Sequence, residues 1–308
     1  MSSVVAVDDL VVELMTANGV IRAVDGVSFH IDHGETVTII GESGSGKSTT
    51  AMALLRLLPD DLAVISGSAS ITGQDVVGTR KHVGELRGRA VALIPQDPMT
   101  ALNPIATIGA QMVEAIRRAD PELDKATART RVVELMRQVH ITAPEKRMRS
   151  YPHELSGGML QRILIAMAIG ADPQLFVADE PTSALDVTVQ AGILDLLLEM
   201  QERTGVAMLL ITHDLGVARL MSDRVHVMRR GVFVEEGPVE QVVESPQHEY
   251  TQALLAAIPD LGPWEDPDPM EPEPTTPEPA PPAPKIPPVP TPDEAAAGAP
   301  ITNGGELP

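Results

Sequence analysis

The chain has 308 residues, of which 43% are hydrophobic and only 2% aromatic, so it can build a sizeable core and that core must be aliphatic. It contains no cysteine, which excludes disulfides, Cys-ligated zinc and Cys-ligated iron–sulfur clusters. The N-terminal stretch MSSVVAVDDLVVEL is acidic where a signal peptide is basic, and no apolar run reaches the roughly 18 residues of a membrane span. We therefore expect a cytosolic chain that reaches a membrane only through a partner.

The formal net charge of −20 at pH 7 is distributed over two parts of the chain. Nine acidic residues and one lysine lie in residues 261–308, which leaves a charge of −12 on the first 260 residues. Neither part has the basic surplus that attracts a polyanion, so the composition predicts no nucleic-acid partner.

Residues 4–40 are rich in short β-favouring runs separated by turn signals such as Asn18-Gly19 and Asp25-Gly26. We expect these runs to form an antiparallel flap at the edge of a ligand site. The runs are residues 4–7, 10–14, 20–24, 27–31 and 36–40.

A glycine-rich stretch, GESGSGKST, follows the apolar run 35–40 and precedes a helical pattern over residues 48–56. Its glycines let backbone N–H groups converge on one phosphate group at a positive helix end. Lys47 is expected to reach the terminal phosphates and the Ser48 hydroxyl to ligate Mg²⁺. The alternative, a flexible turn before an amphipathic helix, does not account for the full match and the strand before it. The predicted nucleotide contacts are Gly41, Ser43, Gly44, Ser45, Gly46, Lys47, Ser48 and Thr49.

The uniformly apolar run 90–94 predicts a strand buried on both faces of a parallel sheet, and 65–71 predicts a further short strand pair. Gln96 directly follows the buried run, in a loop rich in Pro and Asn. At a strand end beside a phosphate site, its side chain is placed to meet Mg²⁺ or water. A glutamine in a loop, taken alone, indicates solvated surface.

Residues 108–140 have apolar side chains at helical spacing and read as a helical insertion that ends near Pro152. The segment LSGGMLQR then leads into an apolar helix over 163–170. Ser156 is a good N-cap, and Ser156, Gly157 and Gly158 leave N–H groups open at a positive helix end. This second anion site lies about 110 residues after the first. One nucleotide does not need both, so we expect the second site to complete the pocket of another subunit. The alternative is an ordinary helix cap.

Two further strand ends carry polar side chains suited to phosphoryl chemistry. The buried run 175–178 ends in Asp179 and Glu180. We expect Asp179 to hold Mg²⁺ opposite Ser48, and Glu180 to polarise the attacking water as general base. The strand 206–211 delivers His213, which is placed to contact the γ-phosphate and that water. A helix over 187–201 lies between the two strands, and a hairpin over 224–235 follows them.

These motifs, in this order over about residues 4–240, resemble the ATP-binding subunits of ABC transporters. The resemblance implies a cofactor pair of ATP and Mg²⁺, with hydrolysis by cassettes paired head to tail. Ser156, Gly157 and Gly158 of one cassette would then face the ATP on the other's phosphate loop, with Asp186 in the D-loop between them. The implied fold is α/β, a P-loop NTPase core with a mixed sheet, an N-terminal antiparallel β flap and a helical signature subdomain at about residues 97–165.

A narrower resemblance, to the dipeptide and oligopeptide importer branch that also includes nickel importers, rests on longer segments. It implies a second, related but different cassette, two transmembrane permease subunits and an extracytoplasmic substrate-binding protein. The chain would lie at the cytoplasmic face of the membrane, with a groove near Gln96 receiving the permeases. A soluble cassette acting on ribosomes or DNA and a non-hydrolysing regulatory cassette are alternatives, and intact Glu180 and His213 argue against the second. The segments are AVDGVSF, IPQDPMTALNP, ELSGGM, ADEPTSALDVTVQ and SPQHEYTQALLAAIPDL.

The chain departs from the family pattern in three places. The family stacks adenine on an aromatic residue before AVDGV, yet none occurs between Leu10 and Gly26, so Leu14 or Val20 is left to supply apolar contact. Leu160 replaces a more usual polar residue in the signature, a change that leaves the Ser-Gly-Gly donors. The C-terminal cysteine cluster of some peptide-import cassettes is absent.

The sequence predicts a cassette over residues 1–261 and a tail over 262–308. The tail holds 16 of the 28 prolines, together with acidic residues, Ala and Thr. Such a composition buries too little apolar area to offset the entropy of ordering, so we expect a disordered, acidic tail. A passive tail is favoured over a partner-binding one.

Overall fold

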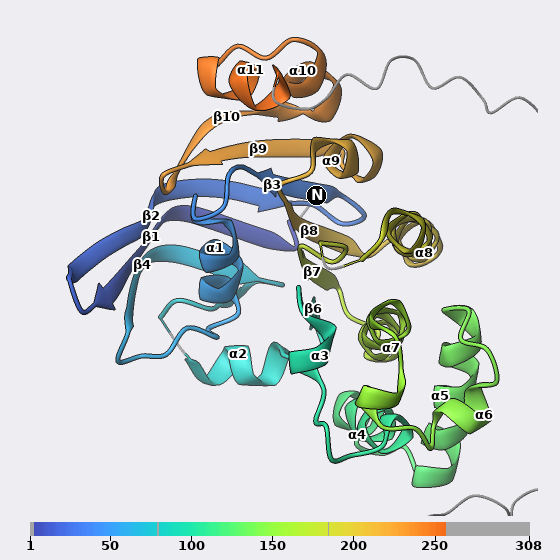
Figure 1. Ribbon diagram of the computed structural model, residues 1–308. Coiled ribbons are helices and arrows are strands. Elements are labelled where there is room, and N and C mark those ends of the chain that lie inside the picture. The colour runs from blue at the N-terminus through green and yellow to red at the C-terminus, as the bar shows by residue number, and fades with distance from the viewer. Residues whose placement is uncertain (1–2, 79, 184, 257–308) are drawn as a thin grey trace, which may run out of the picture. The chain divides into compact units, whose positions relative to one another are not determined.

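Two β-sheets form the centre of the protein in the computed structural model, which describes residues 3–256 except 79 and 184 (Figure 1). The chain divides into the units Met1–Pro259 and Asp260–Pro308, and the second unit, with the predicted tail, lies outside the described residues. The larger sheet has the order β10-β9-β3-β8-β7-β6, parallel except for β10, which confirms the mixed sheet. Its strands are β3 (Thr36–Ile40), β6 (Val91–Ile94), β7 (Leu175–Asp179), β8 (Ala207–Thr212), β9 (Arg224–Arg229) and β10 (Val232–Pro238).

The smaller sheet is the predicted antiparallel flap, with the order β2-β1-β4-β5. Runs 4–7 and 10–14 are one strand rather than two, because the left-handed backbone at Asp9 (φ 50°) forms a bulge that lets pairing resume. Runs 20–24 and 27–31 likewise join, and 65–71 belongs to a single strand. The strands are β1 (Val5–Thr16), β2 (Gly19–Ile31), β4 (Ala63–Ile71) and β5 (Gln74–Asp75).

The assignment of run 36–40 to the flap is wrong. This run is β3, which pairs in parallel with β8 on one side and β9 on the other. All five of its residues are buried, the pattern of a strand covered on both faces. The strand that feeds the glycine-rich loop therefore lies in the middle of the parallel sheet.

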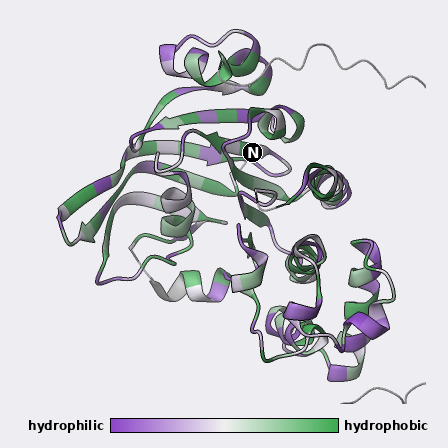
Figure 2. Ribbon diagram, in the orientation of Figure 1, coloured by the Kyte–Doolittle hydropathy of each residue, from purple (hydrophilic) through white to green (hydrophobic). Residues whose placement is uncertain are grey.

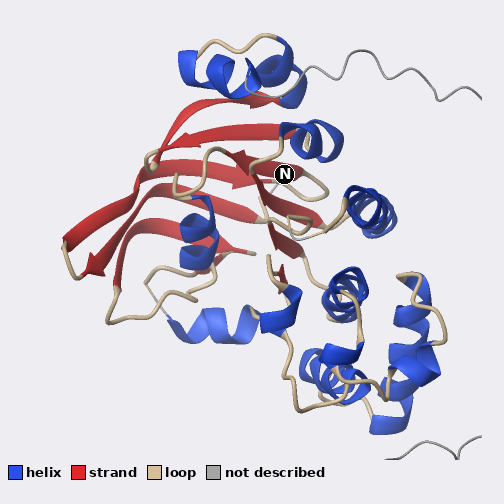
Figure 3. Ribbon diagram, in the orientation of Figure 1, coloured by secondary structure: helices blue, strands red, loops and turns tan. Residues whose placement is uncertain are grey.

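Helices flank the sheets, and α4 to α7 gather on one side of the larger sheet (Figure 3). Of these, α4 and α5 form the helical insertion predicted over residues 108–140, and α7 is the signature helix. The strands of the larger sheet are largely hydrophobic, whereas α5 and α6 carry strongly hydrophilic segments (Figure 2). The helices are α1 (Lys47–Leu54), α2 (Arg80–Leu86), α3 (Pro98–Ala101), α4 (Ile108–Ala119), α5 (Lys125–Gln138), α6 (Pro144–Arg147), α7 (Gly157–Gly170), α8 (Val187–Thr204), α9 (Leu215–Met221), α10 (Val239–Glu244) and α11 (Glu249–Ala256).

Helix α7 begins at Gly157, six residues before the predicted start at Ile163. Ser156 is its N-cap, as predicted, because its side chain accepts a hydrogen bond from the Met159 N–H at 3.4 Å. Glycine lowers helix propensity, so a pattern of apolar residues alone places the start too late. The signature glycines are therefore the first turn of the helix.

The core is aliphatic, as the composition predicts. Among the largest fully buried side chains Phe176 is aromatic and the others are Leu, Ile or Met. One apolar cluster lies between the helical insertion and the larger sheet, and a second joins the flap to the other face of that sheet. A third, smaller cluster joins β9 and the C-terminal helices to Ile40, the last residue of β3.

A buried histidine lies among aromatic rings where β2, β9 and β10 meet. The His226 ring is 2% exposed, with its centroid 5.7 Å from that of Phe29 and 4.7 Å from that of Phe233. Its Nδ1 lies 3.1 Å from a carboxylate oxygen of Glu236, the residue opposite it on β10, whose side chain is 62% exposed. Solvent screens that carboxylate, so it compensates little for the burial of a charged ring.

This histidine should make the protein sensitive to mild acid. Burial first, then the charge of Arg224 and the nearby His30, lower the pKa of His226 to about 4. In the unfolded chain this ring takes up a proton near pH 6.5. The free energy of unfolding is therefore highest above that pH and falls as the pH drops toward 4. We expect a loss of up to about 3 kcal/mol in the free energy of unfolding, at about 1.4 kcal/mol per pH unit. Urea unfolding of wild type and His226→Leu between pH 7.5 and 4.5 tests this, and parallel curves would contradict it.

Candidate nucleotide site

The phosphate loop connects the end of β3 to α1 and depends on glycine at two close contacts. Gly46 (φ 113°) is the N-cap of α1, and a Cβ there would lie 2.4 Å from the Ala23 carbonyl oxygen. A Cβ on Gly41 (φ 151°) would lie 2.2 Å from the Met228 carbonyl oxygen. Only glycine permits this backbone at this distance from β2 and β9. The loop is thus held against two strands that local sequence does not reveal.

Lys47 lies folded over the loop with its side chain buried, and the residue is 4% exposed. Its Nζ donates to the carbonyl oxygens of Gly41 at 2.8 Å and Glu42 at 2.9 Å. Burial lowers the pKa of Lys47, and the nearby carboxylates of Glu180 and Asp179 oppose that shift. The ammonium group therefore occupies the concavity of the loop, where a phosphate oxygen can replace the two carbonyls as its partner.

A hydroxyl and a carboxylate lie together where the sequence predicts a Mg²⁺ site. Ser48 Oγ, in the first turn of α1, donates to Asp179 Oδ1, at the end of β7, at 2.8 Å. Asp179 is 3% exposed; burial raises its pKa, and the hydrogen bond from Ser48 opposes that shift. A buried carboxylate beside a hydroxyl fits a hard divalent cation, because Mg²⁺ takes a few protein oxygens and keeps water and phosphate as its other ligands. Among the described residues no group of three or more His, Cys, Asp or Glu side chains has metal-binding geometry.

Three side chains meet at the carboxyl ends of β6, β7 and β8. Gln96 Nε2 donates to Glu180 Oε2 at 3.0 Å, and His213 Nδ1 lies 3.2 Å from Glu180 Oε1. Each contact involves a different oxygen of the Glu180 carboxylate. Its backbone is left-handed (φ 45°), a conformation that costs roughly 1 kcal/mol or more and that marks many active sites. In this structure Gln96 contacts Glu180 rather than the Ser48–Asp179 pair.

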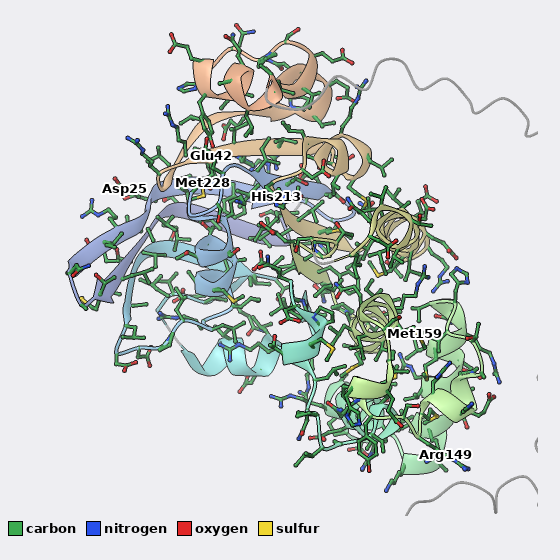
Figure 4. The ribbon with its side chains drawn as sticks, in the orientation of Figure 1. Asp25, Glu42, Arg149, Met159, His213 and Met228 are labelled. Carbon is green, nitrogen blue, oxygen red and sulfur yellow. The ribbon has the colours of Figure 1, made fainter. Side chains whose placement is uncertain are left out.

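These groups border one cavity of about 930 Å³. Two of the residues predicted for the phosphate loop and the Mg²⁺ site do not line it. Asp179 contacts Ser48, which does line it. Ser45 lies behind the loop, where it is 5% exposed and its carbonyl oxygen accepts the Gly231 N–H at 2.8 Å. Figure 4 labels Glu42 and His213, which both line the cavity. The predicted residues that line it are Gly41, Ser43, Gly44, Gly46, Lys47, Ser48, Thr49, Gln96, Glu180 and His213.

The signature segment does not line this cavity. Met159, in the first turns of α7, lies well apart from Glu42 and His213 (Figure 4). Ser156 is exposed and caps α7, and Asp186 is exposed and caps α8 through a 3.0 Å hydrogen bond from the Val189 N–H. A Cβ on Gly158 would lie 2.5 Å from Val189 Cγ1, so glycine there lets α7 approach α8. The two caps are available to another molecule.

The far wall of the cavity includes residues that the sequence interpretation missed. Leu14 lines it, as one of the two predicted apolar contacts, but Val20 does not. Arg22 also lines it, where its guanidinium bonds Glu13 at 3.1 Å and Asp25 at 3.0 Å. No local motif marks these positions. The other missed wall residues are Ile21, Ala23, Arg230, Gly231 and Leu254.

A phosphate loop between a central parallel strand and a helix, with two carboxylates at the end of another strand of the same parallel sheet, defines a P-loop nucleotide-hydrolase site. The sequence model of the ABC transporter family matches residues 24–183, and that of the "oligopeptide/dipeptide transporter, C-terminal region" matches residues 234–282. The chain belongs to the ABC transporter family. It is therefore an ATP-binding cassette of the ATP-hydrolysing kind.

Curated relatives extend the similarity over most of the chain. The oligopeptide transport ATP-binding protein OppD of Bacillus subtilis is 45% identical over 257 residues, covering 83% of this chain and 72% of the relative. The dipeptide transport ATP-binding protein DppD of Escherichia coli is 45% identical over 255 residues, covering 82% and 78%. A solved dimeric ATP-binding cassette with bound ADP and Pi, in a post-hydrolysis state, superposes with a TM-score of 0.68 at 26% identity, covering 76% of this chain and 98% of that one.

Proposed function

We propose that this chain is the ATPase subunit of an importer of dipeptides or oligopeptides. The single observation that carries the ATPase part is the Glu180 carboxylate held between Gln96 and His213 beside the Lys47 loop. The peptide part is supported by relatives that are named for peptide transport and by the match of the C-terminal region. Nickel or another small solute is the alternative cargo.

In this proposal the loop and two strand ends bind the triphosphate. Backbone N–H groups of the loop and the ammonium of Lys47 hold the terminal phosphates. Ser48 and Asp179, with Gln96 as a third candidate, hold Mg²⁺, which when bound neutralises charge on the phosphates. The hydrogen bond between Ser48 and Asp179, 2.8 Å long, supports this assignment because it brings the two oxygen atoms close together.

Glu180 is the proposed general base and His213 the group that faces the γ-phosphate. The carboxylate accepts a proton from the attacking water, while the Gln96 amide fixes its orientation. His213, 58% exposed at the rim, is free to reach toward the reacting phosphate. Catalysis here consists mainly of positioning and charge stabilisation, because phosphoryl transfer needs little covalent help from the protein.

A second cassette is the proposed source of the remaining donors. Ser156, Gly157 and Gly158 present the positive end of α7 outside their own cavity, so they are suited to the ATP bound by a partner. Asp186, exposed at the start of α8, is proposed to lie between the two sites. We propose a head-to-tail pair with a related but different chain.

Two permease subunits and an extracytoplasmic binding protein complete the proposed importer, with this chain on the cytoplasmic face of the membrane. No helix of the described residues is long and apolar enough to cross a membrane. A mostly apolar depression of about 280 Å³ lies between α4, β6 and α7, lined in part by Leu93, Leu164 and Met167. It supports docking of permease helices against α4 and α7 at the start of β6, and the Gln96 loop supplies none of its lining residues. The overall charge of −20 gives no support to a nucleic-acid partner.

Pull-down and uptake together test this function. We expect the full chain, recovered from membranes in mild detergent, to bring two multi-spanning subunits and a second cassette. Replacing the chromosomal copy by Glu180→Gln should then abolish uptake of labelled di- and oligopeptides and leave nickel uptake unchanged. Loss of nickel uptake alone would move the assignment to the alternative cargo. Recovery of ribosomes or DNA factors without membrane subunits would overturn the transporter proposal.

A further inference from the structure

Helix α11, about 200 residues after the phosphate loop, reaches the nucleotide cavity from the C-terminal side. Tyr250, in its first turn, is 6% exposed and packs in the cluster that includes Ile40, the residue directly before the loop. Leu254, one turn later, lines the nucleotide cavity. A helix that no motif connects with ATP therefore supplies both a support for the loop and part of the cavity wall.

The contact between α11 and the loop is a hydrogen bond to backbone. The Glu42 N–H donates to the Tyr250 hydroxyl oxygen at 3.1 Å, across 208 residues of sequence. The Arg229 guanidinium lies over the Tyr250 ring, 4.7 Å from its centroid, and fixes the ring from the side of β9. A buried phenol that accepts a backbone hydrogen bond holds its partner in one position, because a tyrosine ring has few rotamers.

The same peptide group is held at both ends. The Gly41–Glu42 peptide donates its N–H to Tyr250 and accepts from Lys47 Nζ through the Gly41 carbonyl, at 2.8 Å. When Lys47 turns to a phosphate, it gives up that carbonyl, and the bond to Tyr250 remains. Without the phenol, the Gly41–Glu42 peptide would have neither of these two hydrogen bonds once the nucleotide is bound.

Helix α11 is itself anchored independently of the nucleotide. The Glu235 carboxylate, on β10, accepts the backbone N–H groups of Gln247 at 2.6 Å and His248 at 3.1 Å, just before the helix starts. The Tyr250 N–H in turn donates to His248 Nδ1 at 3.0 Å. These bonds fix the first turn of α11, and with it the position of the phenol.

We infer that α11 is part of the ATP site, with Tyr250 as a positioning residue for the phosphate loop and Leu254 as a wall of the nucleotide cavity. The inference rests on the proposed binding of ATP in this cavity. A preorganised loop lowers the cost of ordering on binding, so the phenol acts on nucleotide affinity. Leu254 supplies apolar contact in a cavity whose described lining contains no Phe, Tyr or Trp.

Tyr250→Phe removes the hydroxyl alone and keeps the ring. We expect KM for ATP and the Kd of a fluorescent ATP analogue to rise about 3–10-fold, the worth of one hydrogen bond, with kcat within about twofold of wild type. Tyr151→Phe, in the exposed segment before the signature, is the control and should leave both constants unchanged. Equal affinities for Tyr250→Phe and wild type would overturn the positioning role.

A pair of neighbouring leucines separates a local effect from a loss of packing. Leu254 and Leu255 are both half-buried and both pack against the third apolar cluster, but only Leu254 lines the cavity. Leu254→Ala and Leu255→Ala should lower the melting temperature to a similar extent, because both side chains pack against the same cluster. Leu254→Ala should also raise KM for ATP about threefold, whereas Leu255→Ala should leave KM unchanged. Equal KM values for the two variants would contradict the role of Leu254 as part of the cavity wall.

The leucine pair also decides the inference if Tyr250→Phe does not fold. Wild-type protein that neither binds nor hydrolyses ATP would refute the proposed function itself. Wild-type protein that does both, with Tyr250→Phe and Leu254→Ala indistinguishable from it, would refute only the role of α11.

Discussion

Glu180→Gln should reduce ATP turnover by about two to four orders of magnitude while ATP binding persists. A general base contributes roughly 10²–10⁴ to the rate, and an amide cannot accept the proton. The substituted side chain has the same size, so its amide oxygen can still accept from Gln96 Nε2 and its amide nitrogen can donate toward His213. The cavity should therefore keep its shape and its affinity. Phosphate release and equilibrium binding of ATP, measured on the same preparation, test both halves of the expectation.

The matched control for this variant is Glu199→Gln on α8. Its carboxylate lies 3.8 Å from Arg203 at the protein surface, away from the cavity lining. Removing one such exposed charge should change neither turnover nor affinity. Turnover by Glu180→Gln at the wild-type rate would show that another group activates the water.

Lys47→Ala should weaken ATP binding by about 10- to 100-fold, because it removes a charged donor to the phosphates worth roughly 1.5–3 kcal/mol. Without nucleotide the effect on stability should be small. The loss of the bonds to the Gly41 and Glu42 carbonyls is offset by the removal of a buried charge. Titration with ATP, followed by fluorescence or calorimetry, measures the affinity.

Lys125→Ala, at the exposed start of α5, is the control for loss of one positive charge. It should leave the affinity unchanged at moderate salt, because exposed charges far from the cavity are screened. An affinity of Lys47→Ala equal to that of wild type would place the triphosphate elsewhere in the cavity.

The sequence determined the parts of the site that depend on neighbouring residues. The backbone conformation of the phosphate loop follows from its own glycines, so a nine-residue pattern predicts it without knowledge of the fold. The same holds for Ser156 as the cap of α7, since a cap needs only the next few N–H groups. The buried run 175–178 placed Asp179 and Glu180 at a strand end, and the parallel sheet then brought Asp179 to Ser48 as expected.

The predicted strand boundaries and the predicted sheet are wrong where tertiary contacts override the local pattern. The charged pair Asp8-Asp9 interrupts an apolar alternation and suggests two strands, whereas a bulge continues β1 through it. The run 36–40 looks like its β neighbours in sequence. Its five buried positions become distinctive only when helices and the flap cover both faces of the sheet.

Only the tertiary structure decided which distant groups meet. Strand order puts β3 beside β8 and β9, and β7 beside β6 and β8, so that Gln96 and His213 both reach Glu180. It also brings α11 to the phosphate loop, where the Tyr250 hydroxyl accepts the Glu42 N–H. The physical reason is that strand order and helix docking are set by the collective burial of apolar faces, which no short segment encodes. The backbone conformation of loops and caps depends mainly on the dihedral preferences of a few adjacent residues, which a short segment contains.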